Sequence, residues 1–285
     1  MTDSPPLVGF DRLLGPLWFA GCGNMGSAML ARWIDGGVDP GHISVIRPSG
    51  RPVGHDIRVT TRYPEDEVPA IVLLAMKPYQ IDAAADALAP ILDEGTILVS
   101  ILAGVELASL RARFPAPRTI VRAMPNLPVR IGKGVIGLHG DGGDIAARNL
   151  VTGLMAALGH AEWFEDEALF NLVTTLAGSG PAFVFRFIEA LAEGGAKLGF
   201  PPEQALHLAL ATVEGAAALA RSGPQDPAEL AAAVTSPGGT TAAGLAILDA
   251  DGALEDLVAR ALEASRRRSL EMAAEAELGC PSARV

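Results

Sequence analysis

Short, fully apolar runs alternate with longer segments of helical periodicity through the first half of the chain. Runs of four or five apolar residues are typical of strands in a parallel sheet that is covered on both faces. We predict strands at residues 17–20, 43–46, 71–75, 96–100, 119–123, 135–138 and 160–164, and helices at residues 24–36, 81–92, 105–113 and 145–158. This alternation predicts a doubly wound α/β sheet in a first domain over residues 1–164.

The pattern changes from Glu165 onward, where Ala and Leu dominate and almost every segment is compatible with a helix. We predict helices at residues 166–177, 181–198, 202–221, 227–234, 241–249 and 254–278, in an all-α C-terminal domain over residues 165–285. Residues 204–220 are apolar almost all round the helix, so this helix needs burial on more than one face. We therefore expect a homo-oligomer that assembles through this domain. The alternative is that these helices form the interior of a monomeric bundle.

The 285-residue chain carries a formal net charge of −11 at pH 7, which disfavours binding to the phosphate backbone of nucleic acids. The N-terminus lacks the basic region and the apolar run of a signal peptide. Gly, Pro or a charged residue interrupts each apolar window before the roughly 18 residues of a membrane span. We expect a cytoplasmic protein without a membrane-spanning helix.

Metal-ligating and nucleophilic residues form no recognisable constellation in the sequence. Cys22 and Cys280 are the two cysteines, and their separation matches no metal or redox motif. None of the five histidines pairs with another histidine or a carboxylate at ligand spacing. We expect reduced thiols and no bound metal.

A glycine-rich turn follows the first predicted strand and opens the first predicted helix. Gly21, Gly23 and Gly26 have the G-x-G-x-x-G spacing of Rossmann-type dinucleotide-binding domains. The first glycine permits a tight turn, the second lets the backbone approach the pyrophosphate, and the third lets the helix pack closely on the strand. The N–H groups near Asn24 and Met25 would bind the anion. The alternative is a glycine-rich turn without a ligand.

The end of the second predicted strand distinguishes NADPH from NADH. A carboxylate there would bind the ribose 2′-hydroxyl group of NADH, but the strand ends in Arg47, which Ser49 and Arg51 follow. A guanidinium group suits the 2′-phosphate of NADPH, so we predict NADPH as the cofactor, with NADH as the alternative. The arginine could also be a solvated surface residue. Lys77 and Pro78 follow the strand at residues 71–75, where a strand end faces a cofactor.

Two glycines precede the predicted helix at residues 241–249, in the segment Ser236-Pro237-Gly238-Gly239-Thr240-Thr241. Glycines before a helix leave N–H groups unpaired and allow a close backbone approach, and the helix dipole adds positive potential. We interpret the segment as a cradle for a small carboxylate, in which Thr240 or Thr241 caps the helix or offers a hydroxyl group to the ligand. The alternative is an ordinary Ser-Pro turn with a threonine N-cap.

Ser179 lies in the segment Gly178-Ser179-Gly180-Pro181, which begins another long helix. One interpretation is that Ser179 lines the substrate pocket. The other is that it only forms part of a helix start with proline in the first turn. The sequence does not separate the two.

Six segments, in one order along the chain, match a single enzyme family. They are FAGCGNMG (19–26), LLAMKP (73–78), SILAGV (100–105), VRAMPNLP (121–128), AGSGPAFVF (177–185) and VTSPGGTT (234–241). On these segments the chain resembles the pyrroline-5-carboxylate reductase family. The resemblance implies reduction of 1-pyrroline-5-carboxylate to L-proline with NAD(P)H, the last step of proline biosynthesis. It also implies a helical domain that interlocks into homodimers, which are often assembled into decamers.

The resemblance also implies roles for particular residues. It places the substrate at Ser236, Gly238, Gly239, Thr240 and Thr241. It places the cofactor near Met76, Lys77, Pro78, Ala103 and Asn126. Two positions depart from the family pattern: Leu127 stands where Thr is common, and Tyr63 stands about where many members carry Asn. Both departures concern cofactor binding rather than the reaction.

A protonated cyclic imine accepts a hydride without a strong enzyme acid, so positioning carries most of the expected catalysis and the cofactor supplies the hydride. We expect the N–H groups of the 236–241 loop to hold the substrate carboxylate. Thr241, the predicted catalytic residue, would hydrogen-bond the ring nitrogen and help to protonate or orient it. Two other functions stay open: another NADP-dependent imine or hydroxyacid dehydrogenase of similar architecture, and a scaffold that binds NADP without turnover.

Overall fold

The computed structural model describes residues 15–141 and 144–277. The N-terminal segment, Cys280 and the last residue of the helix predicted to end at 278 lie outside these ranges. The described chain forms two compact units. The first unit contains the residues up to Gly178 together with those from Arg266 onward, and the second unit is Ser179–Ser265.

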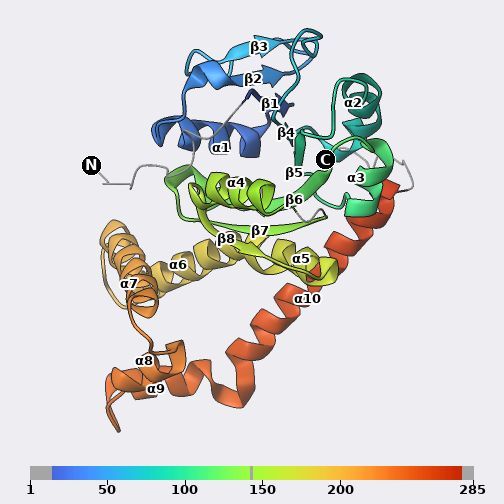
Figure 1. The fold of residues 1–285 in the computed structure, drawn as a ribbon. Coiled ribbons are helices and arrows are strands. Elements are labelled where there is room, and N and C mark those ends of the chain that lie inside the picture. Colours follow the sequence, from blue (N-terminus) through green and yellow to red (C-terminus); the bar gives the residue numbers. More distant parts are fainter. Residues whose placement is uncertain (1–14, 142–143, 278–285) are drawn as a thin grey trace. The chain divides into compact units, whose positions relative to one another are not determined.

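Within the described residues, one eight-stranded sheet organises the first unit (Figure 1). The strands are β1 (Leu17–Ala20), β2 (Ile43–Ile46), β3 (Arg58–Thr60), β4 (Ile71–Leu74), β5 (Ile97–Ser100), β6 (Thr119–Pro125), β7 (Gly134–Asp141) and β8 (Gly159–Trp163). Their order in the sheet is β3-β2-β1-β4-β5-β6-β7-β8, and every neighbouring pair is parallel except β6 and β7. The doubly wound α/β fold is therefore confirmed.

Helices cover both faces of this sheet. On one face lie α1 (Asn24–Asp35) and α4 (Ile145–Ala156), whose buried side chains belong to the same hydrophobic cluster as Leu17 and Phe19 of β1. On the other face lie α2 (Ile81–Leu88) and α3 (Leu107–Arg113), whose buried side chains belong to a second cluster with Trp18 and Ala20 of the same strand. Because alternate residues of a strand point to opposite faces, a fully apolar strand serves both cores.

Two features of the sheet differ from the sequence prediction. The edge strand β3 was not predicted, because its three residues are only partly buried and form no apolar run. Strand β7 runs antiparallel to β6. A parallel connection needs a crossover of about a dozen residues or more, and residues 126–133, which contain the short helix η4 (Leu127–Ile131), do not provide one.

The first unit continues beyond the last strand. Helix α5 (Glu167–Val173) leads into a π-helical turn, η5 (Thr174–Gly178). Phe170 and Val173 of α5 are buried. By its contacts α5 belongs to the unit that contains the sheet, although the predicted domain boundary after residue 164 assigns it to the helical domain.

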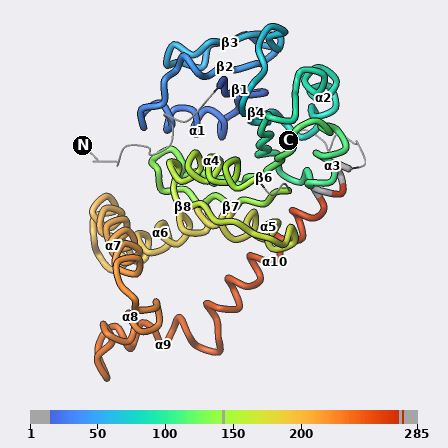
Figure 2. Tube along the Cα trace, in the orientation of Figure 1, coloured from blue at the N-terminus to red at the C-terminus, as the bar shows by residue number. Residues whose placement is uncertain are grey.

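The second unit consists of helices, as predicted from its composition. They are α6 (Gly180–Lys197), α7 (Pro202–Ser222), α8 (Pro227–Ala233), α9 (Thr240–Leu248) and the first part of α10 (Ala253–Glu277). Helices α6 and α7 pack against each other around Ile188, Ala192 and Ala209 (Figure 2). This small cluster is the buried core of the unit.

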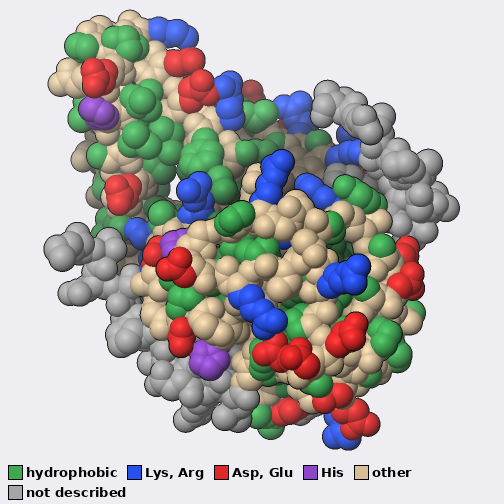
Figure 3. Space-filling view, turned by 90° about the horizontal axis from the view of Figure 1, so that it is seen from above, with side chains coloured by type: hydrophobic (Ala, Val, Ile, Leu, Met, Phe, Trp, Pro, Cys, Tyr) green, Lys and Arg blue, Asp and Glu red, His purple; other side chains and the backbone are tan. Residues whose placement is uncertain are grey.

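Large apolar side chains remain exposed on the second unit. Phe183, Phe185 and Phe187 of α6 are all exposed, and so are Leu206 and Leu210 of α7. Figure 3 shows one face of the molecule, on which hydrophobic side chains remain visible between charged ones. An apolar surface of this extent is typical of an interaction site.

The expectation that no helix is long and apolar enough to span a membrane is wrong. By length and composition alone, the helical stretch Glu167–Lys197 could do so, and only 17% of its most apolar window is buried. The residues expected to interrupt it do not end the helix: η5 carries the chain through Gly178, and Pro181 lies in the first turn of α6, where proline is tolerated. This property alone does not indicate a membrane protein, since a helix that is buried in a subunit interface has the same composition.

Candidate functional site

A cleft of about 1240 Å³ opens in the first unit, beyond the carboxyl ends of β1, β2, β3 and β4. This is the edge at which open α/β sheets bind their ligands. Nine of the predicted cofactor residues line the cleft: Gly21, Gly23, Asn24, Met25, Gly26, Arg47, Ser49, Met76 and Lys77. The fold thus brings together three segments that are distant in the sequence.

The three motif glycines meet three different physical needs. Gly21 has a φ of +82°, and a Cβ there would lie 2.8 Å from the Cα of Met76. A Cβ at Gly26 would lie 3.3 Å from the Cβ of Ala75, so this glycine lets α1 approach the sheet closely. A Cβ at Gly23 would meet nothing within 4 Å and would project into open space. This open space is where the motif places the pyrophosphate of a dinucleotide.

The start of α1 is suited to an anion. Gly23 is its N-cap and provides no side chain to bind the first N–H groups. The first turn contains no acidic residue that would repel an anion. The free N–H groups and the positive end of the helix dipole therefore fit a phosphate group.

The charges around the cleft contrast with the acidic character of the whole chain. Arg47, Arg62 and Lys77 line it, and Glu65 is the one acidic residue among its described lining residues. Cys22 also lines it, as a free and buried thiol whose Sγ lies 3.3 Å from the Oγ of Ser27. Burial raises the pKa of the Cys22 thiol, against smaller lowering effects of the Ser27 hydrogen bond and the Arg47 charge. Arg47, Arg62 and Lys77 thus give the cleft a local excess of positive charge.

Three predicted cofactor residues are not among those that line the cleft. Pro78 begins the short helix η3 (Pro78–Gln80) directly after Lys77. Ala103 is exposed in the loop after β5, whose Ile101 does line the cleft. The third, Asn126, is treated separately because its side chain has other partners.

Both ends of the Asn126 amide bind the backbone. Its Nδ2 donates to the carbonyl oxygen of Ala177 at 2.9 Å, and its Oδ1 accepts from the N–H of Val135 at 2.8 Å. Asn126 is also buried. In this structure its side chain therefore holds β7 and η5 against the end of β6.

Several residues of the cleft were not predicted. Thr61, Arg62 and Tyr79 line it without any motif that would have identified them, and Arg62 follows the unpredicted strand β3. Tyr63 is half-buried and stacks on Trp18, with 6.1 Å between the ring centroids. Burial raises the pKa of Tyr63 to about 12.

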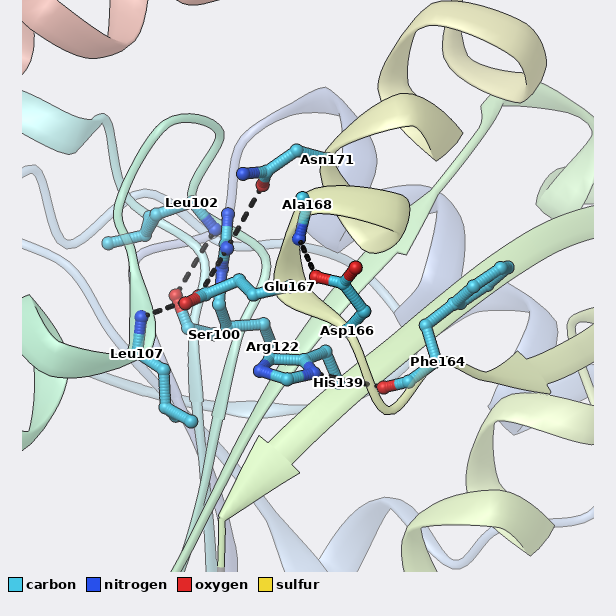
Figure 4. A network of polar contacts seen from close by, with 10 residues as sticks. All are labelled: Ser100, Leu102, Leu107, Arg122, His139, Phe164, Asp166, Glu167, Ala168 and Asn171. Atoms are coloured by element: carbon cyan, nitrogen blue, oxygen red, sulfur yellow. Dashed lines mark hydrogen bonds and ion pairs between the residues drawn. The ribbon is translucent and has the colours of Figure 1, made fainter.

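A buried polar network lies at the far end of the loop after β5 (Figure 4). The Nη1 of Arg122 donates to the Oε1 of Glu167 at 2.6 Å and to the Oδ1 of Asn171 at 3.1 Å. The same Glu167 oxygen accepts from the N–H of Leu107, the first residue of α3, at 2.8 Å. The Arg122 guanidinium also stacks over the Phe170 ring, at 4.5 Å from its centroid.

This network is internally balanced. The Arg122 side chain is only 3% exposed, and burial lowers its pKa, while the hydrogen bond and the charge of Glu167 raise it. Leaving either charge without the other in this environment would be costly. The network therefore joins α5 to the sheet and fixes the start of α3, at the end of the loop that contains Ala103.

In the second unit, the 236–241 loop has an uncapped helix start. Gly238 has a φ of +70°, and the N–H of Gly239 donates to the carbonyl oxygen of Ser236 at 2.9 Å. Gly239, rather than a threonine, is the N-cap of α9, and no side chain caps this helix. The interpretation that Thr240 or Thr241 caps the helix is therefore wrong, because both residues already belong to its first turn. Both side chains are exposed.

Ser179 has a partner within the second unit. Its Oγ lies 2.8 Å from the Oγ of Ser265 in α10. It precedes α6, which begins at Gly180, and it does not cap this helix. Its hydroxyl group thus joins the start of α6 to α10.

Two family models match the chain. One is described as pyrroline-5-carboxylate reductase dimerisation and matches residues 167–272. The other is described as NADP oxidoreductase, coenzyme F420-dependent, and matches residues 17–104, the segment that forms the cleft. The first match covers the helices whose apolar side chains are exposed.

Relatives of known name match over almost the full length. Pyrroline-5-carboxylate reductase from Pseudomonas aeruginosa is 38% identical over 262 residues, which cover 90% of this chain and 96% of the relative. The structure of a pyrroline-5-carboxylate reductase from Coxiella burnetii has a TM-score of 0.82 and 33% identity, covering 90% of this chain and 98% of that one. A Plasmodium falciparum pyrroline carboxylate reductase, solved with NADP bound, has the same fold, with a TM-score of 0.80, 24% identity and coverages of 92% and 99%.

Proposed function

The chain belongs to the pyrroline-5-carboxylate reductase family, and we propose that it reduces 1-pyrroline-5-carboxylate to L-proline with a reduced nicotinamide dinucleotide. In this reaction a hydride adds to the imine carbon and a proton adds to the ring nitrogen, so that C=N becomes CH–NH. The observation that carries the proposal is the cleft at the glycine-rich turn. Nine predicted cofactor residues line this cleft, and the chain belongs to a family of reductases. When bound there, the nicotinamide supplies the hydride.

The residues of the cleft bind and orient the dinucleotide in this proposal. The uncapped start of α1 holds the pyrophosphate, and Gly23 leaves the space for it. Arg47 and Ser49 lie at the end of β2, where they favour a 2′-phosphate. We propose NADPH as the cofactor, with NADH as a slower alternative.

The 236–241 loop binds the acid group of the substrate in this proposal. Its helix start offers N–H groups that no side chain caps, and the dipole of α9 favours a carboxylate. The Thr241 hydroxyl group is exposed and not used for capping, so it is free to hydrogen-bond the ring nitrogen. Holding the imine in a reactive orientation is worth about 7–11 kcal/mol of barrier.

The second unit provides the assembly in this proposal. Its exposed apolar side chains lie within the segment that matches the dimerisation family model. We propose a homodimer formed through these helices. A decameric assembly and a cytoplasmic location stay predictions.

An assay of Thr241→Ala tests the proposal. The purified protein is mixed with 1-pyrroline-5-carboxylate and NADPH or NADH, and dinucleotide oxidation and proline are measured. We expect turnover by the unaltered protein and a loss of about ten- to a hundredfold in kcat for Thr241→Ala, since a hydrogen bond to a charged group contributes roughly 1.5–3 kcal/mol. NADPH affinity should not change.

Thr212→Ala is the matched control, because the Thr212 hydroxyl donates to the carbonyl oxygen of Leu208 within α7 of the same unit. Equal rates for the two variants would contradict the role of Thr241. Reduction of hydroxyacid precursors but not of the cyclic imine would contradict the proposed reaction. Tight NADP binding without turnover of any imine would indicate a scaffold.

A further inference from the structure

We propose that Arg62, which follows β3, forms together with Arg47 a two-arginine clamp for the 2′-phosphate of NADP(H) and is a main determinant of the preference for this cofactor. The inference rests on the proposed function only in that the cleft binds a nicotinamide dinucleotide. The role of Arg47 alone follows from the strand-end argument, whereas Arg62 becomes visible only in the structure.

The sheet brings the two arginines to the same edge. Strands β2 and β3 are parallel neighbours in which Ile46 pairs with Thr60, so their carboxyl ends lie side by side. The N–H of Arg47 donates to the carbonyl oxygen of Thr60 at 2.9 Å. The hydroxyl group of Thr60 in turn donates to the carbonyl oxygen of Arg62 at 2.9 Å.

The loops after the two strands also touch. Gly50 has a φ of +59°, and a Cβ there would lie 3.3 Å from the Cγ2 of Thr61. The loop after β2 thus passes directly against the loop after β3, and Arg47 and Arg62 both line the cleft. Arg51, in the loop after β2, is exposed and does not line the cleft. The second arginine of the clamp is therefore Arg62, which lines the cleft, and not Arg51, which is closer to Arg47 in the sequence.

Several other arginines of the protein are already engaged by carboxylates. Arg58, Arg113 and Arg148 each form an ion pair with a carboxylate, as expected for a chain with a net charge of −11. Within the part of the chain that the structure describes, Arg47 and Arg62 form no such pair. Their guanidinium groups are thus available to an anionic ligand in the cleft.

A 2′-phosphate is the anion that fits this site. It carries close to two negative charges and several acceptor oxygens, which two guanidinium groups can bind with bidentate, charge-assisted hydrogen bonds. The ribose of NAD(H) has a neutral hydroxyl group at the same position and gains little from a second cation. The effect of Arg62 should therefore be selective for the phosphorylated cofactor. Glu65, the acidic residue among the described lining residues of the cleft, repels a phosphate and so weakens this preference.

Equilibrium binding tests the clamp without any catalytic step. Affinities for NADP⁺, NAD⁺ and 2′,5′-ADP are measured by calorimetry for the unaltered protein, Arg62→Gln, Arg47→Gln and the control Arg51→Gln. We expect Arg62→Gln to weaken NADP⁺ and 2′,5′-ADP about ten- to a hundredfold and NAD⁺ less than twofold. Arg51→Gln should change none of the three, and Arg62→Lys should recover part of the loss. Thermal unfolding without ligand confirms that each variant is folded.

Three results would overturn the clamp. In the first, Arg62→Gln binds NADP⁺ as well as the Arg51→Gln control does. In the second, it weakens NAD⁺ as much as NADP⁺, which would place Arg62 on a part that both dinucleotides share. In the third, the unaltered protein does not prefer NADP⁺. A selective loss of NADP⁺ affinity in a protein that fails to reduce the imine would leave the clamp intact and remove only the proposed reaction.

Discussion

The two units of this protein are both rich in apolar residues, but they bury them in different ways. In the first unit the sheet and its helices enclose Trp18, Phe19 and Phe114 completely. In the second unit Phe185 and Phe187 are about half exposed, and the core is a small cluster on α6 and α7. A sheet covered on both faces can bury its strands within one chain, whereas helices that are apolar all round need neighbours that one chain does not supply.

This difference in burial distinguishes a unit that contains the cleft from a unit that exposes an apolar surface. The first unit contains its own cleft and needs no partner to form it. The family model for pyrroline-5-carboxylate reductase dimerisation matches residues 167–272. The exposed apolar side chains of α6 and α7 lie within this range. The apolar stretch that has the length and composition of a membrane span begins at Glu167 in the first unit and ends at Lys197 in α6 of the second unit. The comparison thus predicts that mutations in the two units act through different equilibria.

The largest expected effect is on assembly. Phe185→Asp should dissociate the oligomer, because a charge in the centre of an apolar interface costs about 2–4 kcal/mol and raises the dissociation constant roughly 30- to 1000-fold. Light scattering across a range of protein concentrations measures this change. Val68→Asp is the matched control in the first unit, since Val68 is 51% exposed and Phe185 is 56% exposed. If both variants keep the oligomer intact, the exposed face of the second unit is not the interface.

A smaller effect is expected on the stability of the subunit. In the Phe185→Asp background, Phe114→Ala should lower the free energy of unfolding by about 3–5 kcal/mol, because it empties a fully buried site. Phe187→Ala, at a half-exposed site, should lower it by less than about 1 kcal/mol in the same background. Urea unfolding measures both values. Equal losses would contradict the difference between the two units.

The smallest expected effect is a pH dependence within the first unit. The folded state holds the proton of Tyr63 up to about pH 12, whereas the unfolded chain loses it near pH 10. Stability from this group is therefore complete below pH 10 and declines as the pH rises to about 12, by roughly 2 kcal/mol. Tyr63→Phe should remove this part of the alkaline loss in urea unfolding. A variant with the same alkaline profile as the unaltered protein would show that Tyr63 is not buried.

The sequence predicts elements well where a residue pattern is local. Strands β1 and β2 have their predicted bounds, because each is a short apolar run next to turn-forming residues. Gly21, Gly23 and Gly26 were assigned from their spacing between a predicted strand and a predicted helix, and the close approaches at Gly21 and Gly26 and the open space at Gly23 agree with this motif. Such features depend on a few neighbouring residues.

The remaining features depend on contacts between distant segments. Arg62 reaches the cleft only because the short strand β3 pairs with β2. The Asn126 amide binds Ala177 and Val135, and no local pattern contains these partners. The predicted N-cap of α9 was a threonine, but in the structure it is Gly239, because Gly238 turns the chain with a positive φ before the helix begins. Tertiary pairing, rather than local propensity, decides these positions.

Deuterium transfer tests most directly whether the protein carries out the reaction. NADPH with both hydrogens at C4 of the nicotinamide replaced by deuterium is incubated with 1-pyrroline-5-carboxylate and the protein, and the proline formed is analysed by mass spectrometry. We expect proline with one deuterium on the ring CH2 carbon next to nitrogen, not on the carbon that bears the carboxylate, because the CH2 carbon was the imine carbon of the substrate. Absence of labelled proline, with the dinucleotide still bound to the protein, would contradict the proposed function.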